Sequence, residues 1–339
     1  MDQERPLRTL AGILASGDIP HAFLFTGIDG IGKRSAAMGF AMACNCLSPD
    51  AAPSVNIPTH PTTGVVLPFC GVCRICRAIA TGIHPDVTEI RPEGDIIKIG
   101  RIRELIDRLA FRPHEARVRV VIIEDAGAMN TEAANALLKS LEEPPPRTLF
   151  FLTAGHPSDL LPTVVSRCRQ VRFVPVSAEN IGGLLRHRFA MPADEARAVA
   201  LLSGGSVAKA LTLAEGGSEA ESLTACRRWL AGELAALPSR PVPRVLAFAE
   251  RLQKDRNRVG QWLAMLYGCL YDAVLWQCGR SRVTGADLAD DLRKISERAT
   301  FEALARKLDA VADVEKAVAR KLNVRLAMEK MALALADKL

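Results

Sequence analysis

The sequence has few aromatic residues, no long apolar run and no block of like charges. Aromatic residues make up 5% of the 339 positions and hydrophobic residues 49%, which predicts cores of Leu, Ala, Val and Ile. No apolar stretch approaches the length of a membrane span, and the charged start MDQERPLRTL is unlike a signal peptide, so we expect a cytoplasmic protein. The formal charge of +6 is spread along the chain, which permits a surface facing nucleic acid but does not require one.

Nine cysteines are present, and in a reducing compartment they are not expected to form a disulfide framework. Three of them have the spacing Cys70-x-x-Cys73-x-x-Cys76, and Cys46 upstream supplies a fourth thiolate for a closed tetrahedral zinc site. Cys44 is the rival fourth ligand, but two residues earlier on the same helix it should point to another face. The spacing predicts a structural zinc site, with an iron–sulfur cluster or reduced packing thiols as the alternatives.

A glycine loop follows an apolar strand near the N-terminus, in the segment AFLFTGIDGIGKRS. Gly27, Gly30, Gly32 and Lys33 follow the phosphate-loop spacing, in which backbone N–H groups and a helix N-terminus surround an anion. The motif requires Ser or Thr after the lysine to ligate magnesium, and the residue here is Arg34. ATP binding is therefore in doubt and hydrolysis is not expected; the alternative is a glycine turn without a ligand.

Two acidic residues follow the strongest predicted strand, the β-branched run from Val118 to Ile123. In nucleotide-hydrolysing proteins, acids at this place hold magnesium and orient the attacking water. Here the usual Asp-Glu order is inverted to Glu124-Asp125, and the shorter Asp should reach poorly. Both residues are candidate nucleotide-site residues, with capping of the strand end as the alternative.

Predicted strands alternate with helical segments in the first half of the chain, which indicates a three-layer α/β domain with a parallel sheet. The strands are expected at 22–25, 87–90, 95–99, 118–123, 148–153 and 170–173. The segment 47–69 carries five prolines and reads as a loop or excursion. Beyond Pro175 the strand signal disappears and the rest of the sequence is typical of helices.

These patterns predict three domains. The first, over 1–174, is a phosphate-loop domain with a zinc module at about 44–80. The second, over 175–216, is a small helical domain, and the third, over 217–339, is entirely helical.

The motifs GIDGIGK, CGVCRIC, HPD, NALLKSLEEPP and SRC occur in this order, and together they resemble the clamp-loader subunits of bacterial DNA polymerase III, most closely the delta-prime branch. The resemblance covers Ala22 to about Leu213 with specific motifs. It implies an AAA+ module with a zinc-bearing insertion, a helical lid and a C-terminal collar domain for oligomerisation. It also implies a hetero-oligomer with tau/gamma and delta subunits that uses ATP to load the sliding clamp on primed DNA.

The same resemblance assigns roles to single residues. Arg167 of the SRC motif would act in trans as an arginine finger at a neighbour's ATP site, unless it pairs with a local carboxylate. Ala154-Gly155 replaces a pair of threonines found in the hydrolysing relatives, and Ala208 replaces a phosphate-sensing arginine. A non-hydrolysing subunit is thus expected. The alternatives are an active ATPase of the tau/gamma kind and a stand-alone zinc and DNA-binding protein.

Overall fold

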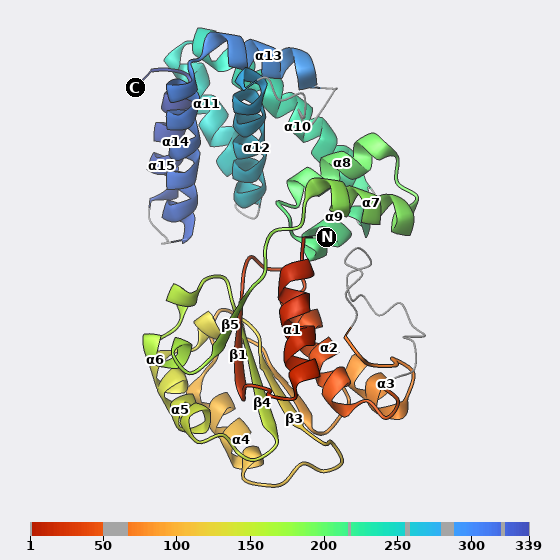
Figure 1. The fold of residues 1–339 in the computed structure, drawn as a ribbon. Helices are drawn as coiled ribbons and strands as arrows, with labels where there is room; N and C mark the ends of the chain where they lie inside the picture. The colour runs from red at the N-terminus through yellow and green to blue at the C-terminus, as the bar shows by residue number, and fades with distance from the viewer. Residues whose placement is uncertain are drawn as a thin grey trace. The chain divides into compact units, whose positions relative to one another are not determined.

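The computed structural model describes residues 2–49, 67–215, 218–254, 258–278, 288–319 and 323–338 (Figure 1). The chain divides into two compact units. Unit 1 comprises Met1–Asn180 and Gly205–Ala208, and unit 2 comprises Ile181–Gly204 and Lys209–Leu339. Most of the predicted loop at 47–69, and the predicted boundary at 216–217, lie outside the described residues. No helix in the described ranges is long and apolar enough to cross a membrane.

Unit 1 is built on a five-stranded parallel sheet with the strand order β2-β3-β4-β1-β5 (Figure 1). The strands are β1 (Ala22–Thr26), β2 (Val87–Ile90), β3 (Arg119–Ile123), β4 (Thr148–Ala154) and β5 (Arg169–Arg172). Every residue of β1, β3 and β4 is buried, as expected for parallel strands covered on both faces, and this explains their nearly continuous apolar sequences. The predicted α/β class with a parallel sheet is confirmed.

The strand predicted at 95–99 is wrong. This segment forms only two isolated bridges, one between Glu93 and Ile96 and one between Ile97 and Met129. Gly94, with a φ of 67°, turns the chain just before it, and helix α4 already begins at Ile99. Too few residues remain between the turn and the helix for a ladder with a neighbouring strand.

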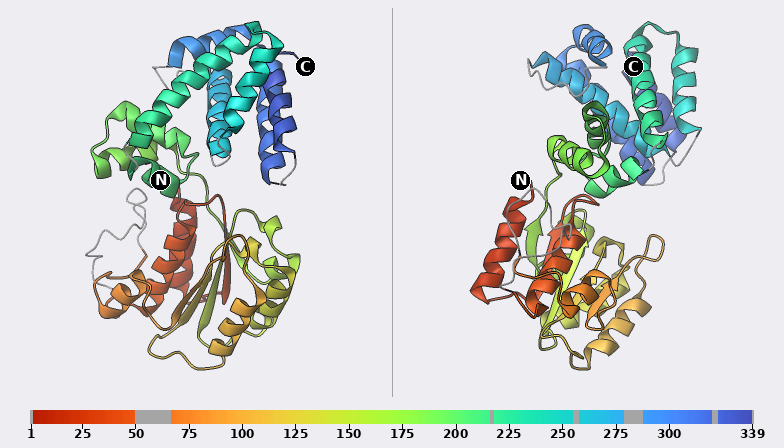
Figure 2. Two further views of the ribbon diagram at one scale, coloured as in Figure 1. Left: turned by 180° about the vertical axis from the view of Figure 1, so that it is seen from behind. Right: turned by 90° about the vertical axis from the view of Figure 1, so that its right-hand side faces the viewer.

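Helices cover both faces of the sheet (Figures 1 and 2). One core lies between the sheet and the helices α1 (Glu4–Ser16), α2 (Lys33–Asn45) and α3 (Arg74–Ala80). The other lies under α4 (Ile99–Leu109), α5 (Thr131–Glu142) and α6 (Pro162–Val165). Several phenylalanines gather in the first core, where the rings of Phe23 and Phe151 stack with centroids 5.0 Å apart.

In the described ranges, unit 2 consists of helices and short helical turns. They are most of α7 (Ala178–Phe189), α8 (Ala193–Leu202), most of α9 (Val207–Glu215), α10 (Ser218–Ala236), α11 (Val242–Gln253), α12 (Val259–Gln277), α13 (Ala289–Arg298), α14 (Phe301–Ala319) and α15 (Val324–Leu335). Helices α11, α12, α14 and α15 form a bundle (Figure 2), and α8 packs on α10 and α12. The predicted helical C-terminal region is confirmed, and the division of the helices into two domains stays a prediction.

Candidate functional site

β1 leads into a loop in which three glycines have positive φ angles, 138° at Gly27, 75° at Gly30 and 101° at Gly32. A Cβ at Gly27 would lie 2.7 Å from the carbonyl oxygen of Phe173, and one at Gly30 would lie 2.2 Å from Oγ of Ser206. At Gly27 and Gly30, both the positive φ angle and the lack of room for a Cβ atom therefore require glycine. Since α2 begins directly after this loop, the sequence-predicted glycines stand before a helix N-terminus, as phosphate-binding loops do.

The Lys33 side chain is turned back into its own loop. It is only 6% exposed, and its Nζ donates hydrogen bonds to the carbonyl oxygens of Gly27 and Ile28, the latter at 3.1 Å. The same ammonium lies 3.1 Å from the Asp29 carboxylate, but that carboxylate is 94% exposed, so water screens the pair. The two carbonyl groups are therefore the main partners of the lysine.

Arg34 is bound by two carboxylates from neighbouring strand ends. Its Nη2 lies 2.8 Å from Oε1 of Glu89, on β2, and its Nε lies 3.0 Å from Oε1 of Glu124, directly after β3. Arg91 joins the group, with its Nε 2.7 Å from Glu124 and its Nη2 2.9 Å from Glu89. Two guanidinium groups thus balance two carboxylates at the first turn of α2.

Asp125, the second acid predicted for this site, has different neighbours from Glu124. It has a left-handed φ of 47°, and its N–H donates to the Thr153 hydroxyl at 3.0 Å. Burial, with the nearby charges of Asp29 and Asp159, raises the pKa of Asp125, and Lys33 only partly opposes this. A carboxylate that is already costly to ionise is a poor partner for further negative charge.

A phosphate at this loop would compete with contacts that the loop residues already make. The lysine is engaged by backbone carbonyls, and Glu124 is engaged by arginines. From the other side, the N–H of Ala208 donates to the carbonyl oxygen of Gly30 at 3.0 Å, so the first turn of α9 contacts the loop directly. Phosphates would have to displace the partners of Lys33 before they could use its charge.

Four cysteines meet beside the first core. The sulfur atoms of Cys46, Cys70, Cys73 and Cys76 all lie within 4.8 Å of one another. Cys46 follows α2 directly, Cys73 precedes α3 and Cys76 lies in the first turn of α3, so the site joins two helices. Cys44 is not among the grouped residues, and burial raises the pKa of its thiol to about 12.

The geometry and the donors of this group suit a tetrahedral thiolate-binding metal. Zinc–sulfur bonds of about 2.3 Å place the sulfur atoms about 3.8 Å apart, and those of Cys46 and Cys70 are 3.5 Å apart. Burial opposes ionisation of Cys73, but hydrogen bonds from the N–H groups of Leu47 and Cys76 outweigh it and lower the pKa of Cys73 to about 6. At Cys73 the backbone thus stabilises negative charge on sulfur, whereas burial raises the pKa of the Cys76 thiol.

The His-Pro-Asp segment at 84–86 has a structural role. Both carboxylate oxygens of the buried Asp86 accept backbone N–H bonds, from His114 at 2.7 Å, Glu115 at 2.8 Å and Ala116 at 2.9 Å. The His84 Nδ1 accepts the N–H of Asp86 at 3.1 Å. His84 is not among the residues grouped with the four cysteines.

We expect Asp86→Ala to lower the free energy of unfolding by roughly 3 kcal/mol, because three charge-assisted hydrogen bonds disappear. Burial raises the pKa of Asp86, but the three N–H donors outweigh it, so the folded-state pKa is lower than usual. The stabilisation is therefore complete above the unfolded pKa of about 3.9 and is lost as the pH falls through the lower folded pKa. Urea unfolding at pH 7 and at pH 3 measures this, with the exposed Asp95→Ala as control.

Arg167 follows α6 and is paired within its own chain. Its Nη2 lies 2.5 Å from Oε1 of Glu142, the last residue of α5, and its Nη1 donates to the Thr163 carbonyl oxygen at 2.7 Å. The two paired side chains are 33% and 48% exposed, so the ion pair is screened by water. The local carboxylate that the sequence analysis named as the alternative is thus present.

Comparison with known families decides the assignment of the chain. The family described as DNA polymerase III, delta subunit, matches residues 2–177, and the family described as DNA polymerase III, delta subunit, C terminal, matches residues 230–337. The chain belongs to the DNA polymerase III delta subunit family. The predicted resemblance to this group of proteins is confirmed.

Delta′ and tau subunits of DNA polymerase III have similar sequence identities to the chain. DNA polymerase III subunit delta′ of Pseudomonas aeruginosa is 38% identical over 189 residues, 55% of this chain and 53% of that protein. Subunit tau of Escherichia coli is 35% identical over 203 residues, 59% of this chain and 29% of tau. The chain spans about half the length of the curated delta′ relatives it matches. A DNA polymerase III gamma subunit-related protein of Thermotoga maritima superposes over 98% of this chain and 99% of its own, at 22% identity and a TM-score of 0.45.

Three residues around these family motifs were not expected from the sequence. Glu89 and Arg91 hold Arg34 and Glu124, and Glu142 holds Arg167. Each contact joins segments far apart in the sequence, as between positions 34 and 89. The pairing of β2 with β3 and the docking of α2 on the sheet bring Glu89 and Arg91 to Arg34 and Glu124, and the packing of α5 against α6 brings Glu142 to Arg167, so no local signal pointed to these partners.

Proposed function

We propose that the chain is a non-hydrolysing clamp-loader subunit of DNA polymerase III. The contact that supports this most directly is the binding of Arg34 by Glu89 and Glu124. In hydrolysing phosphate-loop proteins, this position carries the hydroxyl that ligates magnesium, and an acid after the following strand helps to hold the ion. Here a guanidinium stands at the first position and is paired with the acid at the second.

The other expected catalytic groups are also replaced. Ala154 ends β4, and Ala208 contacts the glycine loop through its backbone N–H, so neither offers a polar side chain toward a phosphate. The overall similarity does not decide between delta′ and tau, since relatives of both kinds are 31–38% identical to the chain. The proposal therefore rests on these positions.

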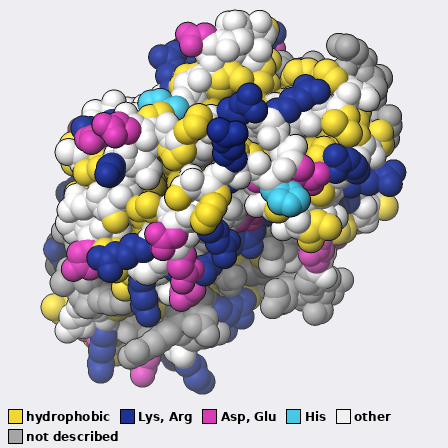
Figure 3. All heavy atoms as spheres, turned by 90° about the horizontal axis from the view of Figure 1, so that it is seen from below, with side chains coloured by type: hydrophobic (Ala, Val, Ile, Leu, Met, Phe, Trp, Pro, Cys, Tyr) yellow, Lys and Arg dark blue, Asp and Glu magenta, His cyan; other side chains and the backbone are white. Residues whose placement is uncertain are grey.

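An active tau/gamma-like ATPase is the second candidate, because the loop glycines and Lys33 are intact. A stand-alone DNA-binding protein is less well supported. On the face shown in Figure 3, Lys and Arg side chains are interspersed with Asp and Glu, with no continuous basic track over the described part of that face. Affinity for DNA driven by phosphate contacts needs such a concentration of positive charge.

As a clamp-loader subunit, the chain would act through its neighbours. We propose that it assembles with tau/gamma and delta subunits, helps to load the sliding clamp on primed DNA and supplies Arg167 to the ATP site of an adjacent subunit. The glycine loop and the cysteine group then serve its own fold and not catalysis. This role accounts for a family member that keeps the overall architecture while its own nucleotide site carries substituted residues.

We expect the isolated protein not to hydrolyse ATP, and Arg34→Thr to restore little activity. The single substitution frees Glu89 and Glu124 from Arg34, but it supplies neither the lid arginine nor a water-orienting Glu. Steady-state phosphate release by the wild type, Arg34→Thr and Lys33→Ala checks this. All three should lie at the background of a sample without protein. A wild-type rate comparable to that of an active clamp-loader ATPase, abolished by Lys33→Ala, would support the second candidate instead.

A further inference from the structure

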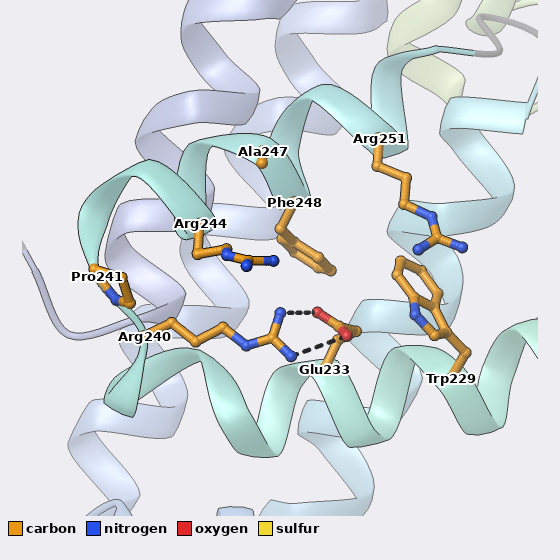
Figure 4. Close-up of a pocket in the computed structure, with 8 residues that line it drawn as sticks. All are labelled: Trp229, Glu233, Arg240, Pro241, Arg244, Ala247, Phe248 and Arg251. Carbon is orange, nitrogen blue, oxygen red and sulfur yellow. Dashed lines mark hydrogen bonds and ion pairs between the residues drawn. The ribbon is translucent and has the colours of Figure 1, made fainter.

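A basic pocket lies in unit 2, between α10 and α11. It has a volume of about 550 Å³, and its main lining residues are Trp229, Glu233, Arg240, Arg244, Phe248 and Arg251 (Figure 4). Three arginines thus face one acid across a hollow in the surface. None of these residues is used by the proposed function.

The single acid of this pocket is already neutralised. Both carboxylate oxygens of Glu233 bind Arg240, one of them at 3.0 Å from Nη2. Arg244 and Arg251 have no acidic partner among the residues that the structure describes. Within the described part of the chain, the pocket therefore presents two guanidinium groups without an acidic partner, each with a planar set of donors that matches a carboxylate.

The two free arginines are arranged along one face of α11. They are seven residues apart, which on a helix is two turns and a rise of about 10 Å, and Phe248 lies between them (Figure 4). Arg251 is held in place by Trp229, since its Cζ lies 4.0 Å from the centre of that ring. Such a contact orients a guanidinium and leaves its N–H groups free to bind an anion.

The tryptophan is not available to stack on a nucleobase. Arg251 covers its ring, and the rings of Phe248 and Trp262 lie near it, with centroids 6.1 Å and 5.8 Å away. Single-stranded nucleic acid is bound by open aromatic faces along a basic track. A hollow whose tryptophan ring is covered by Arg251 does not offer such a face, whereas its arginines do complement carboxylates.

We propose that this pocket binds an acidic segment of a partner protein, in which two carboxylates flank an apolar side chain. The carboxylates pair with Arg244 and Arg251, and the apolar side chain packs on the exposed Pro241 and Ala247 of the pocket lining. The proposal is independent of the clamp-loader function, because it rests only on the charges and shape of this pocket.

The test uses the full-length protein and two labelled peptides, acetyl-EELEE-amide and its neutral counterpart acetyl-QQLQQ-amide, in fluorescence anisotropy. We expect the acidic peptide to bind with a dissociation constant on the order of 100 μM, weakened by added salt, and the neutral one to bind at least tenfold less tightly. Arg244→Ala and Arg251→Ala should each weaken binding about tenfold. Arg244→Lys, which keeps the charge but not the planar donors, should have a smaller effect.

The control is Arg293→Ala, which removes an exposed arginine of α13 that is paired on its own helix with Glu297. It should leave peptide binding unchanged, and far-UV circular dichroism and thermal unfolding should show that every variant is folded. Equal binding of both peptides, unchanged binding by an Arg244→Ala/Arg251→Ala double variant, or no binding of the acidic peptide at 1 mM would each overturn the proposal. A ten-residue oligo-dT that binds through these arginines, when the acidic peptide does not, would assign the pocket to nucleic acid instead.

Discussion

Replacing Arg167 by alanine in the reconstituted clamp loader is expected to lower ATP hydrolysis at the neighbouring subunit by about 10³-fold or more, while the complex still assembles. An arginine delivered from one subunit to the γ-phosphate of the next stabilises the charge that develops during phosphoryl transfer, an effect of about 10³ to 10⁵ in rate. In the chain alone, the guanidinium is bound to Glu142 and to the Thr163 carbonyl oxygen. Because the ion pair is partly exposed and screened, exchanging it for a phosphate costs little.

Two further variants separate this role from a structural one. Glu142→Gln removes the charge of the local partner, so it should leave hydrolysis at wild-type level or raise it. Arg101→Ala, which removes a surface arginine of the same unit paired with Glu104, should have no effect. Phosphate release and gel filtration are measured together. Unchanged hydrolysis in an intact Arg167→Ala complex would refute the arginine finger, and a complex that no longer assembles would favour the pairing with Glu142 as a structural contact.

The sheet could be predicted from the sequence because its strands carry local signals. β3 and β4 are buried on both faces, so their sequences are continuous apolar runs that no amphipathic helix would show. The segment at 95–99 is also largely apolar, but it is short. The turn at Gly94 and the start of α4 leave too few residues for pairing with a neighbouring strand. The hydrophobic pattern alone therefore does not predict whether a short segment between a turn and a helix forms a strand.

In the candidate site, too, local spacing could be predicted from the sequence, but contacts between distant segments could not. Three of the four cysteines lie within seven residues of one another, so their spacing already indicates that they can meet at one point. Arg34 could be recognised as the wrong residue for its motif, but its partners could not be named. Glu89 reaches it only through strand pairing, and nothing in the sequence VTEI distinguishes this acid from a solvent-facing one.

Removal of the metal from the cysteine group is the second large effect that we expect. One zinc per chain should be bound by Cys46, Cys70, Cys73 and Cys76, and Cys73→Ser should lose most of it. Three of these residues belong to the first hydrophobic core, and they tie the end of α2 to α3. Because metal binding contributes directly to folding free energy, its loss should lower the thermal midpoint of unfolding by roughly 10 °C or more, at about 2–4 °C per kcal/mol.

Elemental analysis and thermal unfolding of the wild type, Cys73→Ser, Cys46→Ser and Cys44→Ser test this assignment. Cys44→Ser is the matched control, since Cys44 lies two residues from a ligand but outside the sulfur group, and it should keep both the zinc and the stability. Absence of metal from the wild type, or full zinc content in Cys46→Ser with loss in Cys44→Ser, would contradict the ligand set. A closed shell of four thiolates leaves no position for a substrate, so the cysteine variants should change the stability of the protein. The rate of ATP hydrolysis in the assembled complex should depend on Arg167 and not on the zinc.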